Sequence, residues 1–457
     1  MNKDRKLAAN SLGISESIVM GMAGSAPAFS ISAAVVALVA TVQTLAPASV
    51  LYCGIIMFGI TLSFIHLNKL KVNAGASYAW VNAIFGRHLG FFAGWALLVS
   101  AAVFMVSGSI PAATATLLFI APQWVDSPAV VTLVAAFWIT FISAVAVKGI
   151  KPASYLQVLM TVIEVGILLV IIVAGIILFA KQPAHIFSFS WFSLTDFTPS
   201  TFASGALTAV FLYWGWDVTL NLNEETKDAR HAPGWGAFWS VLIIILLFES
   251  FIITALLVLS DSEIQKSGTN IIFAIADQIF PRPWSYLAVL SVVLSSIGTL
   301  ETNILQFTRT LFAQGRDGAM HPRFALLHSS RRSPWVATLT IWIFGMLLLF
   351  FSSYSTTIRL LMIDSVNAVG FQVAFYYSLT GFACAWYYRR AWGNAMELLG
   401  YIIWPTFSAI FLIYIALYSI PTFDWITNLV GLGGIFIGVI PFFLNERRLK
   451  IKKKAMN

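Results

Sequence analysis

Six acidic residues lie within long apolar stretches of the sequence, where a carboxylate has few partners. They are Glu16, Glu164, Asp217, Glu249, Glu301 and Asp364. Burying an unpaired carboxylate is costly, so each group must be protonated, be paired or face water. The basic residues His66, Arg309 and Arg359 all lie near the ends of such stretches. This excess of acids predicts a missing positive partner, which could be a proton, a metal cation or the amine of a small molecule.

Three of these acids are candidates for handling the positive charge. For Glu164 we favour a role in binding a proton or cation over that of a neutral buried acid, and Glu301 can share its network. For Asp217 we favour contact with a substrate or a proton over structural capping of a helix end. The other three acids receive no part in the predicted site.

Two apolar stretches carry residues that interrupt a helix near its middle. Within Phe211-Leu-Tyr-Trp-Gly-Trp-Asp217, Gly215 stands between Trp214 and Trp216. The first apolar stretch has small residues and a proline at Gly21, Gly24, Ser25, Ala26 and Pro27. Glycine weakens a helix and proline cannot donate to it. Interruptions in corresponding segments of two halves indicate an inverted-repeat transporter with its site at the breaks. The alternative is that membrane helices merely tolerate these residues.

Composition places the chain among helical membrane proteins. Of its 457 residues, 59% are hydrophobic and 10% are charged, whereas a soluble domain has about 25% charged residues. The two cysteines, Cys53 and Cys384, suggest neither a disulfide framework nor a metal site. Motifs of hydrolases, phosphate-binding loops and zinc sites are missing from the sequence, so we expect no enzyme and no cofactor.

Twelve apolar segments of sufficient length are predicted to cross a membrane. They lie at roughly 14–41, 47–67, 88–120, 128–149, 153–180, 200–223, 235–260, 283–308, 335–352, 357–388, 395–419 and 423–444. If the amino terminus is cytoplasmic, 23 of the 27 Lys and Arg residues fall on the cytoplasmic side. This bias predicts cytoplasmic termini and explains the net charge of +8 as topology instead of nucleic-acid binding.

Four motifs, in order, resemble the amino acid–polyamine–organocation transporter superfamily over nearly the whole chain. The motifs are Gly24-Ser-Ala-Pro-Ala-Phe29; Ala74-Gly-Ala-Ser-Tyr-Ala-Trp80 with Phe85-Gly86; Phe211–Asp217 with Glu224-Glu225; and Arg309–Gly318 with Pro322 and Pro334. The resemblance implies a leucine-transporter-type fold of five plus five inverted repeats, with helices 1 and 6 broken and two further helices at the carboxyl end.

The resemblance also implies roles for individual residues. Backbone at Gly24, Ser25 and Ala26 would face the substrate, with the positive end of a half-helix nearby. Phe211 would close over the substrate. Trp214, Gly215 and Trp216 would form the unwound segment that precedes Asp217.

The sequence departs from the family pattern at two positions. Pro27 replaces a glycine, which removes a backbone N–H that could hold a carboxylate. Glu164 stands where many relatives carry a lysine thought to replace a sodium ion. Because the charge is of opposite sign, coupling by that lysine mechanism is not expected here. Pro27, together with the excess of acids, favours a cationic or decarboxylated substrate.

We therefore expect one membrane domain over residues 1–457, with repeats at about 14–180 and 200–388, two more helices at about 395–444 and a basic cytoplasmic tail at 445–457. Its expected function is secondary active transport of an amino acid or amine, such as a monoamine or polyamine, across the cell membrane by alternating access. Proton coupling is expected, with substrate exchange as the alternative; a membrane nutrient sensor is the alternative of another class. The expected assembly is a monomer or homodimer.

Overall fold

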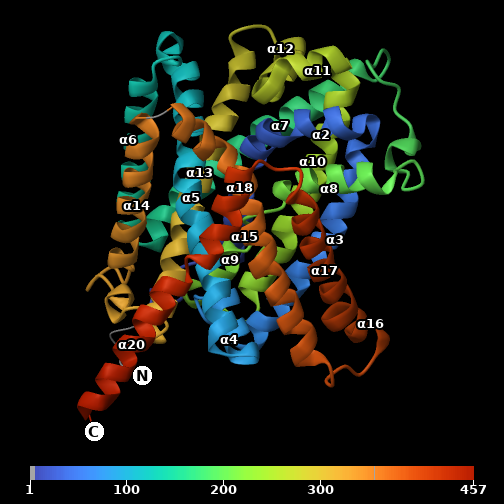
Figure 1. Cartoon of the computed structure of the whole chain (residues 1–457). Coiled ribbons are helices and arrows are strands. Elements are labelled where there is room, and N and C mark those ends of the chain that lie inside the picture. The colour runs from blue at the N-terminus through green and yellow to red at the C-terminus, as the bar shows by residue number, and fades with distance from the viewer. Residues whose placement is uncertain (1–5, 355, 457) are drawn as a thin grey trace.

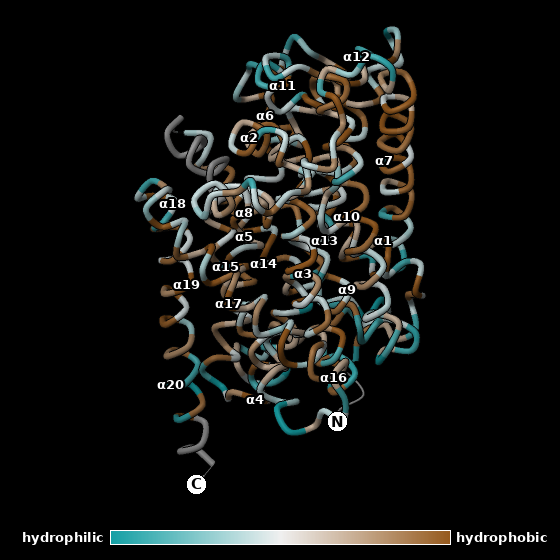
Figure 2. Tube along the Cα trace, turned by 90° about the vertical axis from the view of Figure 1, so that its right-hand side faces the viewer, coloured by the Kyte–Doolittle hydropathy of each residue, from teal (hydrophilic) through white to brown (hydrophobic). Residues whose placement is uncertain are grey.

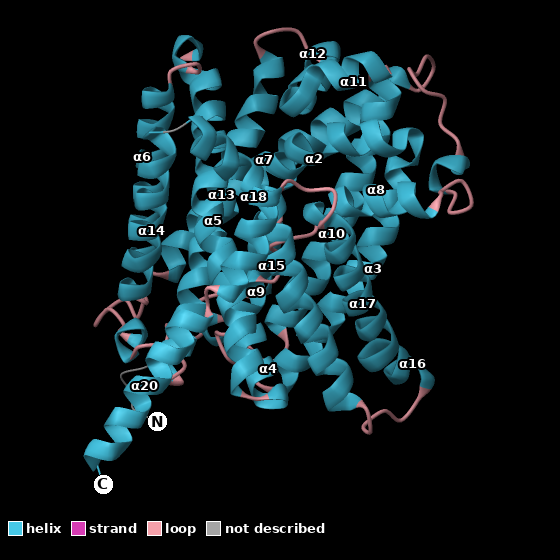
Figure 3. Ribbon diagram, in the orientation of Figure 1, coloured by secondary structure: helices cyan, strands magenta, loops and turns pink. Residues whose placement is uncertain are grey.

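The computed structural model describes residues 6–354 and 356–456, and the side chains of these residues except 356–367 and 452–456. Asp364 and the lysines from Lys452 onward are therefore outside the described side chains. Within this range the chain is helical, and its one β-type contact is an isolated parallel bridge between Leu12 and Thr226 (Figure 3).

The α-helices are α1 (Ile14–Gly24), α2 (Pro27–Val42), α3 (Ala46–Leu70), α4 (Ser77–Phe85), α5 (Arg87–Ile120), α6 (Pro128–Lys148), α7 (Ile150–Phe179), α8 (Pro199–Leu212), α9 (Val218–Asn221), α10 (Ala232–Val258), α11 (Asp261–Ser267), α12 (Ile271–Ile279), α13 (Leu287–Arg316), α14 (Trp335–Tyr354), α15 (Thr356–Tyr388), α16 (Ala395–Leu398), α17 (Trp404–Ser419), α18 (Trp425–Asn428), α19 (Gly434–Phe436) and α20 (Val439–Met456).

The long helices have the length and apolar composition that suit a hydrocarbon environment. In the described chain, ten helical segments are long and apolar enough to cross a membrane. The first of these runs over Ile14–Leu70, 57 residues that include α1, α2 and α3, and about 20 residues suffice for one crossing. The apolar helix Pro199–Leu212 is shorter than the others. The chain is thus a multi-pass helical membrane protein by length and composition.

The helices form one bundle with two polar ends. The first and last described residues lie at the same end, which also carries α4 and α16, and α11 and α12 cover the opposite end (Figure 1). Hydrophilic residues gather at both ends, and α7 presents a hydrophobic run between them (Figure 2). This distribution of hydropathy is the one that a bilayer requires.

Helix α13 contacts most of the helices that surround the candidate site. It packs against α5 and α7 and also contacts α1, α2 and α9. The predicted span ends at about residue 308, but α13 continues to Arg316. The reason is that Arg309 is completely buried and paired inside the protein, so it does not mark a helix end. The short helices α4, α11 and α12 were not predicted.

Candidate functional site

The first long apolar segment is interrupted between α1 and α2. Helix α1 ends at Gly24, and Ala26 adopts a left-handed conformation with φ of 48° and ψ of 65° before α2 begins at Pro27. Proline suits this first position because no helical partner is needed for its missing N–H. The N–H of Ser25 donates to Gly21 and Met22, and the N–H of Ala26 donates to Ala23.

A carboxylate from a distant helix satisfies the start of α2. The N–H of Ala28 donates to Oε1 of Glu164 at 2.9 Å, and Glu164 is only 1% exposed. The next N–H, of Phe29, donates to the Ser295 hydroxyl at 3.1 Å. A helix amino terminus favours an anion or an acceptor oxygen, and here a carboxyl oxygen of the protein itself takes that position. The amides of residues 25, 26, 28 and 29 therefore all have partners inside the protein.

The second interruption meets the first through backbone. Helix α8 ends at Leu212, α9 begins at Val218, and Gly215 between them has a φ of +97°, which glycine adopts without strain. A Cβ placed on Gly24 would lie 2.1 Å from the Gly215 carbonyl oxygen, and a Cβ on Gly215 would lie 2.1 Å from the Gly24 oxygen. Both positions must be glycine for the two breaks to touch in this way.

Asp217 lies directly after the second break and is held by three neutral donors. Gln306 Nε2 and the Tyr376 hydroxyl donate to Oδ2 at 2.7 and 3.2 Å, and the Tyr377 hydroxyl donates to Oδ1 at 2.8 Å. The side chain is fully buried. Asp217 thus joins α9 to α13 and α15, and it does not line either of the two cavities described below.

Glu301 belongs to a second polar cluster, between α7 and α13. With the Gln157 amide oriented so that its oxygen accepts from Thr161, its nitrogen donates to the Gly298 carbonyl and to Oε2 of Glu301, each at 3.0 Å. The other oxygen of Glu301 is buried without a hydrogen-bond partner. Gln157, Thr161 and Glu164 follow one another at helical spacing on α7, so both acids lie along the same α7–α13 seam.

The remaining predicted residues serve packing in this conformation. Gly21 faces α10, because a Cβ there would meet the Ser240 hydroxyl at 2.4 Å. Trp216 is fully buried, with its ring 5.2 Å from that of Phe64. Among the acids outside the predicted site, Glu16 accepts from the Gly13 N–H at 2.9 Å, and both oxygens of Glu249 are buried without a partner.

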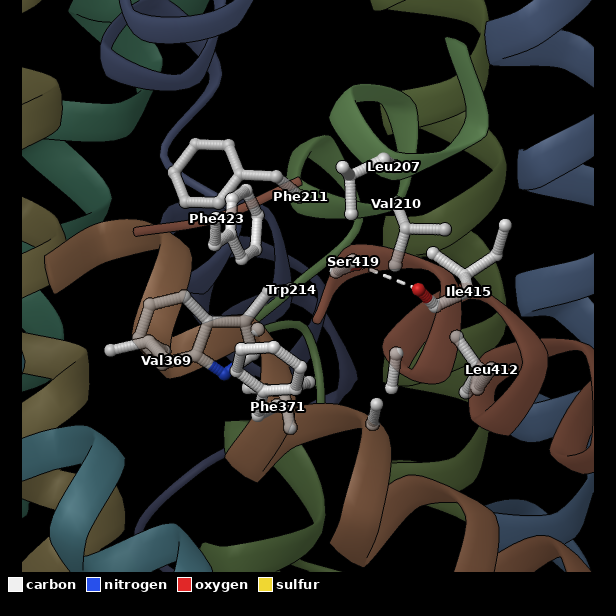
Figure 4. Close-up of a pocket in the computed structure, with 14 residues that line it drawn as sticks. Leu207, Val210, Phe211, Trp214, Val369, Phe371, Leu412, Ile415, Ser419 and Phe423 are labelled. Carbon is white, nitrogen blue, oxygen red and sulfur yellow. Dashed lines mark hydrogen bonds between the residues drawn. The ribbon is translucent and has the colours of Figure 1, made fainter. Parts of the chain in front are cut away.

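A large cavity lies beside the two breaks. Its volume is about 600 Å³, and Phe29 of α2 and Phe211 of α8 both line it. Its polar lining side chains are uncharged: Ser32, Ser107, Thr114, Thr208, Thr269 and Asn270. A smaller apolar cavity of about 60 Å³ adjoins it, where Phe211 and Trp214 are among the lining residues (Figure 4). The structure therefore brings Phe211 and Trp214 to the cavities and leaves Gly24 to Pro27 just outside them.

Two ion pairs close the end of the bundle that carries α4. Arg309 makes a bidentate pair with Glu225 at 2.9 and 3.0 Å, and both side chains are almost completely buried. Arg316 pairs with Glu224 at 2.7 and 2.8 Å, and Glu224 also accepts from the Ala74 N–H. These contacts join the end of α13 to the segment after α9.

Sequence reasoning missed several partners in this arrangement. Asp217 receives amide and hydroxyl donors and Glu164 a backbone donor, and none of these partners was predicted from the sequence. The pairing of Arg309 and Arg316 with Glu225 and Glu224 could have been predicted from the sequence, because the expected topology places all four residues on the same side of the membrane. The tyrosine donors and Ser295 carried no such signal, since single hydroxyls are common in apolar helices.

These features define a multi-pass helical membrane protein with two interrupted helices that meet beside a cavity. Residues 14–457 match the model of a family described as amino acid permease. The chain belongs to this family.

Three relatives show the range of the similarity. The chain is 25% identical to the branched-chain amino acid permease of Lactococcus lactis, over 60% of this chain and 61% of that protein. It is 23% identical to the serine/threonine exchanger of Bacillus subtilis, over 62% of this chain and 63% of the relative. It is 22% identical to the b(0,+)-type amino acid transporter 1 of Mus musculus, over 65% and 61%. The matches thus span about three fifths of the length of these relatives.

Proposed function

We propose that this protein is a secondary active transporter of an amino acid or amine that works by alternating access. The observation that carries the proposal is the backbone contact between Gly24 and Gly215, which joins two interrupted helices beside a cavity of about 600 Å³. Broken helices that meet at mid-membrane are a recurrent way to build a transporter site. Membership of the amino acid permease family and the names of its relatives support the same function.

The proposed topology has twelve crossings. Of the ten apolar segments, Ile14–Leu70 is long enough for two crossings, and α8 with α9 makes one more across its break. The two interrupted crossings are then the first and the sixth, as a five-plus-five inverted repeat requires, with two helices left at the carboxyl end. We place both termini on the cytoplasmic side of a cell membrane, because this orientation puts most Lys and Arg residues on the cytoplasmic side.

In this topology the structure is closed toward the cytoplasm and hollow toward the outside. The buried Arg309–Glu225 and Arg316–Glu224 pairs lie at the cytoplasmic end. The large cavity includes Thr269 and Asn270, which lie between α11 and α12 at the opposite end (Figure 1). Alternating access would break these ion pairs and collapse the outer cavity.

Glu164 offers a way to couple substrate to protons. As a carboxylate it accepts the Ala28 N–H, the kind of group that could otherwise hold a substrate carboxylate. Protonation would remove its negative charge from the start of α2 and release this amide to the substrate. Glu301, on the same seam, is the proposed second proton site, and Asp217 transmits the state of the break to α13 and α15 through its donors.

For the substrate, the uncharged lining of the large cavity favours an amino acid with an uncharged side chain. The relatives include a branched-chain permease and a serine/threonine exchanger, which supports this class. An amine is the second candidate, because Pro27 lacks an N–H and the neighbouring amides are already engaged.

A matched pair of ligands separates the two candidates. Leucine and 3-methylbutylamine differ only by the carboxyl group. The purified protein in proteoliposomes should accumulate one of them when an inward proton gradient is imposed, and that ligand should raise its thermal stability. Uptake that needs preloaded substrate and ignores the gradient would indicate exchange. Binding without uptake in either assay would indicate a sensor and contradict the transport proposal.

A further inference from the structure

Phe423 is the inward-facing residue of an otherwise exposed turn between α17 and α18. Its ring is half-buried, whereas Thr422, Asp424 and Trp425 are exposed. The turn is held by its own hydrogen bonds: the Phe423 N–H donates to the Ser419 carbonyl at 3.0 Å, and the Asn428 side chain donates to the Phe423 carbonyl at 3.3 Å. This local network directs the Phe423 ring toward the interior.

Asp424 stabilises the same turn at the start of α18. Its carboxylate accepts the N–H groups of Ile426 and Thr427, each at 2.8 Å, and thereby caps α18. The Phe423 ring packs edge-on against Phe371 of α15, with a centroid distance of 5.8 Å. The inward position of the ring is therefore fixed by both the backbone and a neighbouring helix.

The Phe423 ring lies on the boundary between the two cavities. Leu207, Phe211 and Phe423 line both the large and the small cavity. Figure 4 labels Phe211, Phe423 and Trp214 among the residues that line the small cavity. A group that extends from the large cavity into the small one can therefore contact side chains that line both.

The small cavity suits an aliphatic group. Its lining comes from α8, α15, α17, Phe423 and Trp214 of the second break, and its single hydroxyl, on Ser419, already donates to the Ile415 carbonyl at 2.7 Å (Figure 4). The other polar atom of the lining is the Trp214 indole nitrogen, which is buried without a hydrogen-bond partner, and the remaining lining side chains are apolar. Its volume of about 60 Å³ exceeds several times the roughly 10–15 Å³ that one water needs.

We propose that Phe423 is a specificity-determining residue that, together with Phe211, controls how far the aliphatic end of the substrate enters the small cavity between α8, α15 and α17. This inference rests on the proposed transport function and adds the substrate class, a molecule with an aliphatic chain. It assigns a part of the binding site to the last two membrane helices and their connection.

The test is the dependence of uptake on chain length in proteoliposomes. The substrates are the straight-chain amino acids from alanine to norleucine and the straight-chain amines that lack their carboxyl group. Ala416 lines the small cavity, so Ala416→Leu should raise KM for the longest chain at least about tenfold and leave the shortest within about twofold. Phe423→Ala should reduce the ratio of kcat/KM between the longest and shortest chains. Phe423→Leu should restore part of that ratio.

Two control variants carry similar changes away from the cavity. Trp425→Ala removes an exposed ring from the same turn, and Leu417→Phe adds bulk on the exposed face of α17. Both should keep the chain-length profile of the unchanged protein. If Ala416→Leu shifts all chain lengths equally, or if Phe423→Ala matches Trp425→Ala, the proposed role of Phe423 is wrong while transport stands. If the unchanged protein takes up no member of either series, the transport proposal fails first.

Discussion

At the scale of single residues, the proposed proton coupling depends on the bond from the Ala28 N–H to Glu164. Glu164→Gln keeps an acceptor for this N–H but cannot exchange a proton. We expect loss of uptake driven by a proton gradient and a flat pH profile, with part of the substrate exchange retained. The measurement is uptake in proteoliposomes with and without an imposed gradient.

The matched control for this experiment is Glu249→Gln, since Glu249 is also a buried acid within a helix but touches none of the site residues named here. It should keep gradient-driven uptake. If Glu164→Gln and Asp217→Asn both leave uptake and its pH dependence unchanged, proton coupling through these carboxylates is excluded.

The close backbone contact between Gly24 and Gly215 predicts that a methyl group at either position impairs transport. Gly24→Ala would place a Cβ about 2.1 Å from a backbone oxygen that cannot move independently, and Gly215→Ala would add left-handed strain of about 1–2 kcal/mol. Each variant should reduce uptake by at least about tenfold. Gly166→Ala on α7 is the control, because its added methyl meets nothing within 4 Å. Normal uptake by Gly24→Ala would show that the breaks need not touch.

At the scale of helices, the predicted segments agree with the structure where the sequence is a continuous apolar run. The prediction of 128–149 corresponds to α6 at Pro128–Lys148, and 47–67 lies within α3 at Ala46–Leu70. Short helices such as α12 were missed because a nine-residue helix is too short for its apolar run to indicate a crossing. Hydropathy gives the crossings, but it does not reveal which charges are paired within them.

The candidate site was predictable only in part for a similar reason. The breaks at Gly24 and Gly215 are local, so residue type alone marked them. The partners of Asp217 come from α13 and α15, some 89 and 159–160 residues away in the chain. Only the three-dimensional packing brings these donors to the carboxylate, and the same holds for the Phe423 turn beside Phe211.

The Arg309–Glu225 pair should dominate the closure of the α4 end. Removal of one partner leaves a buried charge, so Glu225→Gln should destabilise the protein by about 3–5 kcal/mol. The measurement is thermal unfolding of the purified protein. The control is Arg282→Ala, which breaks an exposed pair with Asp277 and should change the midpoint little. The double variant Glu225→Gln, Arg309→Met should recover much of the loss, and failure to recover would contradict a pairwise effect.

The opposite end carries a pH-dependent contact. Arg282 donates two hydrogen bonds of 3.1 Å to Asp277, and this pairing, with a further bond from Ser285, lowers the pKa of the Asp277 carboxyl. A lowered pKa stabilises the folded protein above the ordinary aspartate pKa of about 4, and that contribution is lost as the pH falls through the lowered value. The unfolding midpoint of Asp277→Asn should therefore lie slightly below that of the unchanged protein at pH 6, by the small amount expected for an exposed pair, and approach it below about pH 4. A constant difference would contradict this assignment.

At the scale of the whole molecule, the proposed twelve crossings depend on α8 and α9 completing one crossing despite the break. If they do, the loop before α8 is outside and the segment after α9 is inside; if α8 and α9 form a re-entrant loop, both lie outside. Thr195 and His231 are exposed on these two segments. Cys53 and Cys384 are buried, so they give little background in thiol labelling.

Thr195→Cys and His231→Cys therefore provide a direct test with a membrane-impermeant maleimide. In intact cells the cysteine at 195 should be labelled, and the cysteine at 231 should react only after the membrane is permeabilised. Prior blocking with a permeant maleimide should abolish both signals, which controls for expression and access. Equal labelling of both positions in intact cells would place α8 and α9 in a re-entrant loop. That outcome would remove the sixth crossing, and with it the five-plus-five repeat on which alternating access around Gly24 and Gly215 depends.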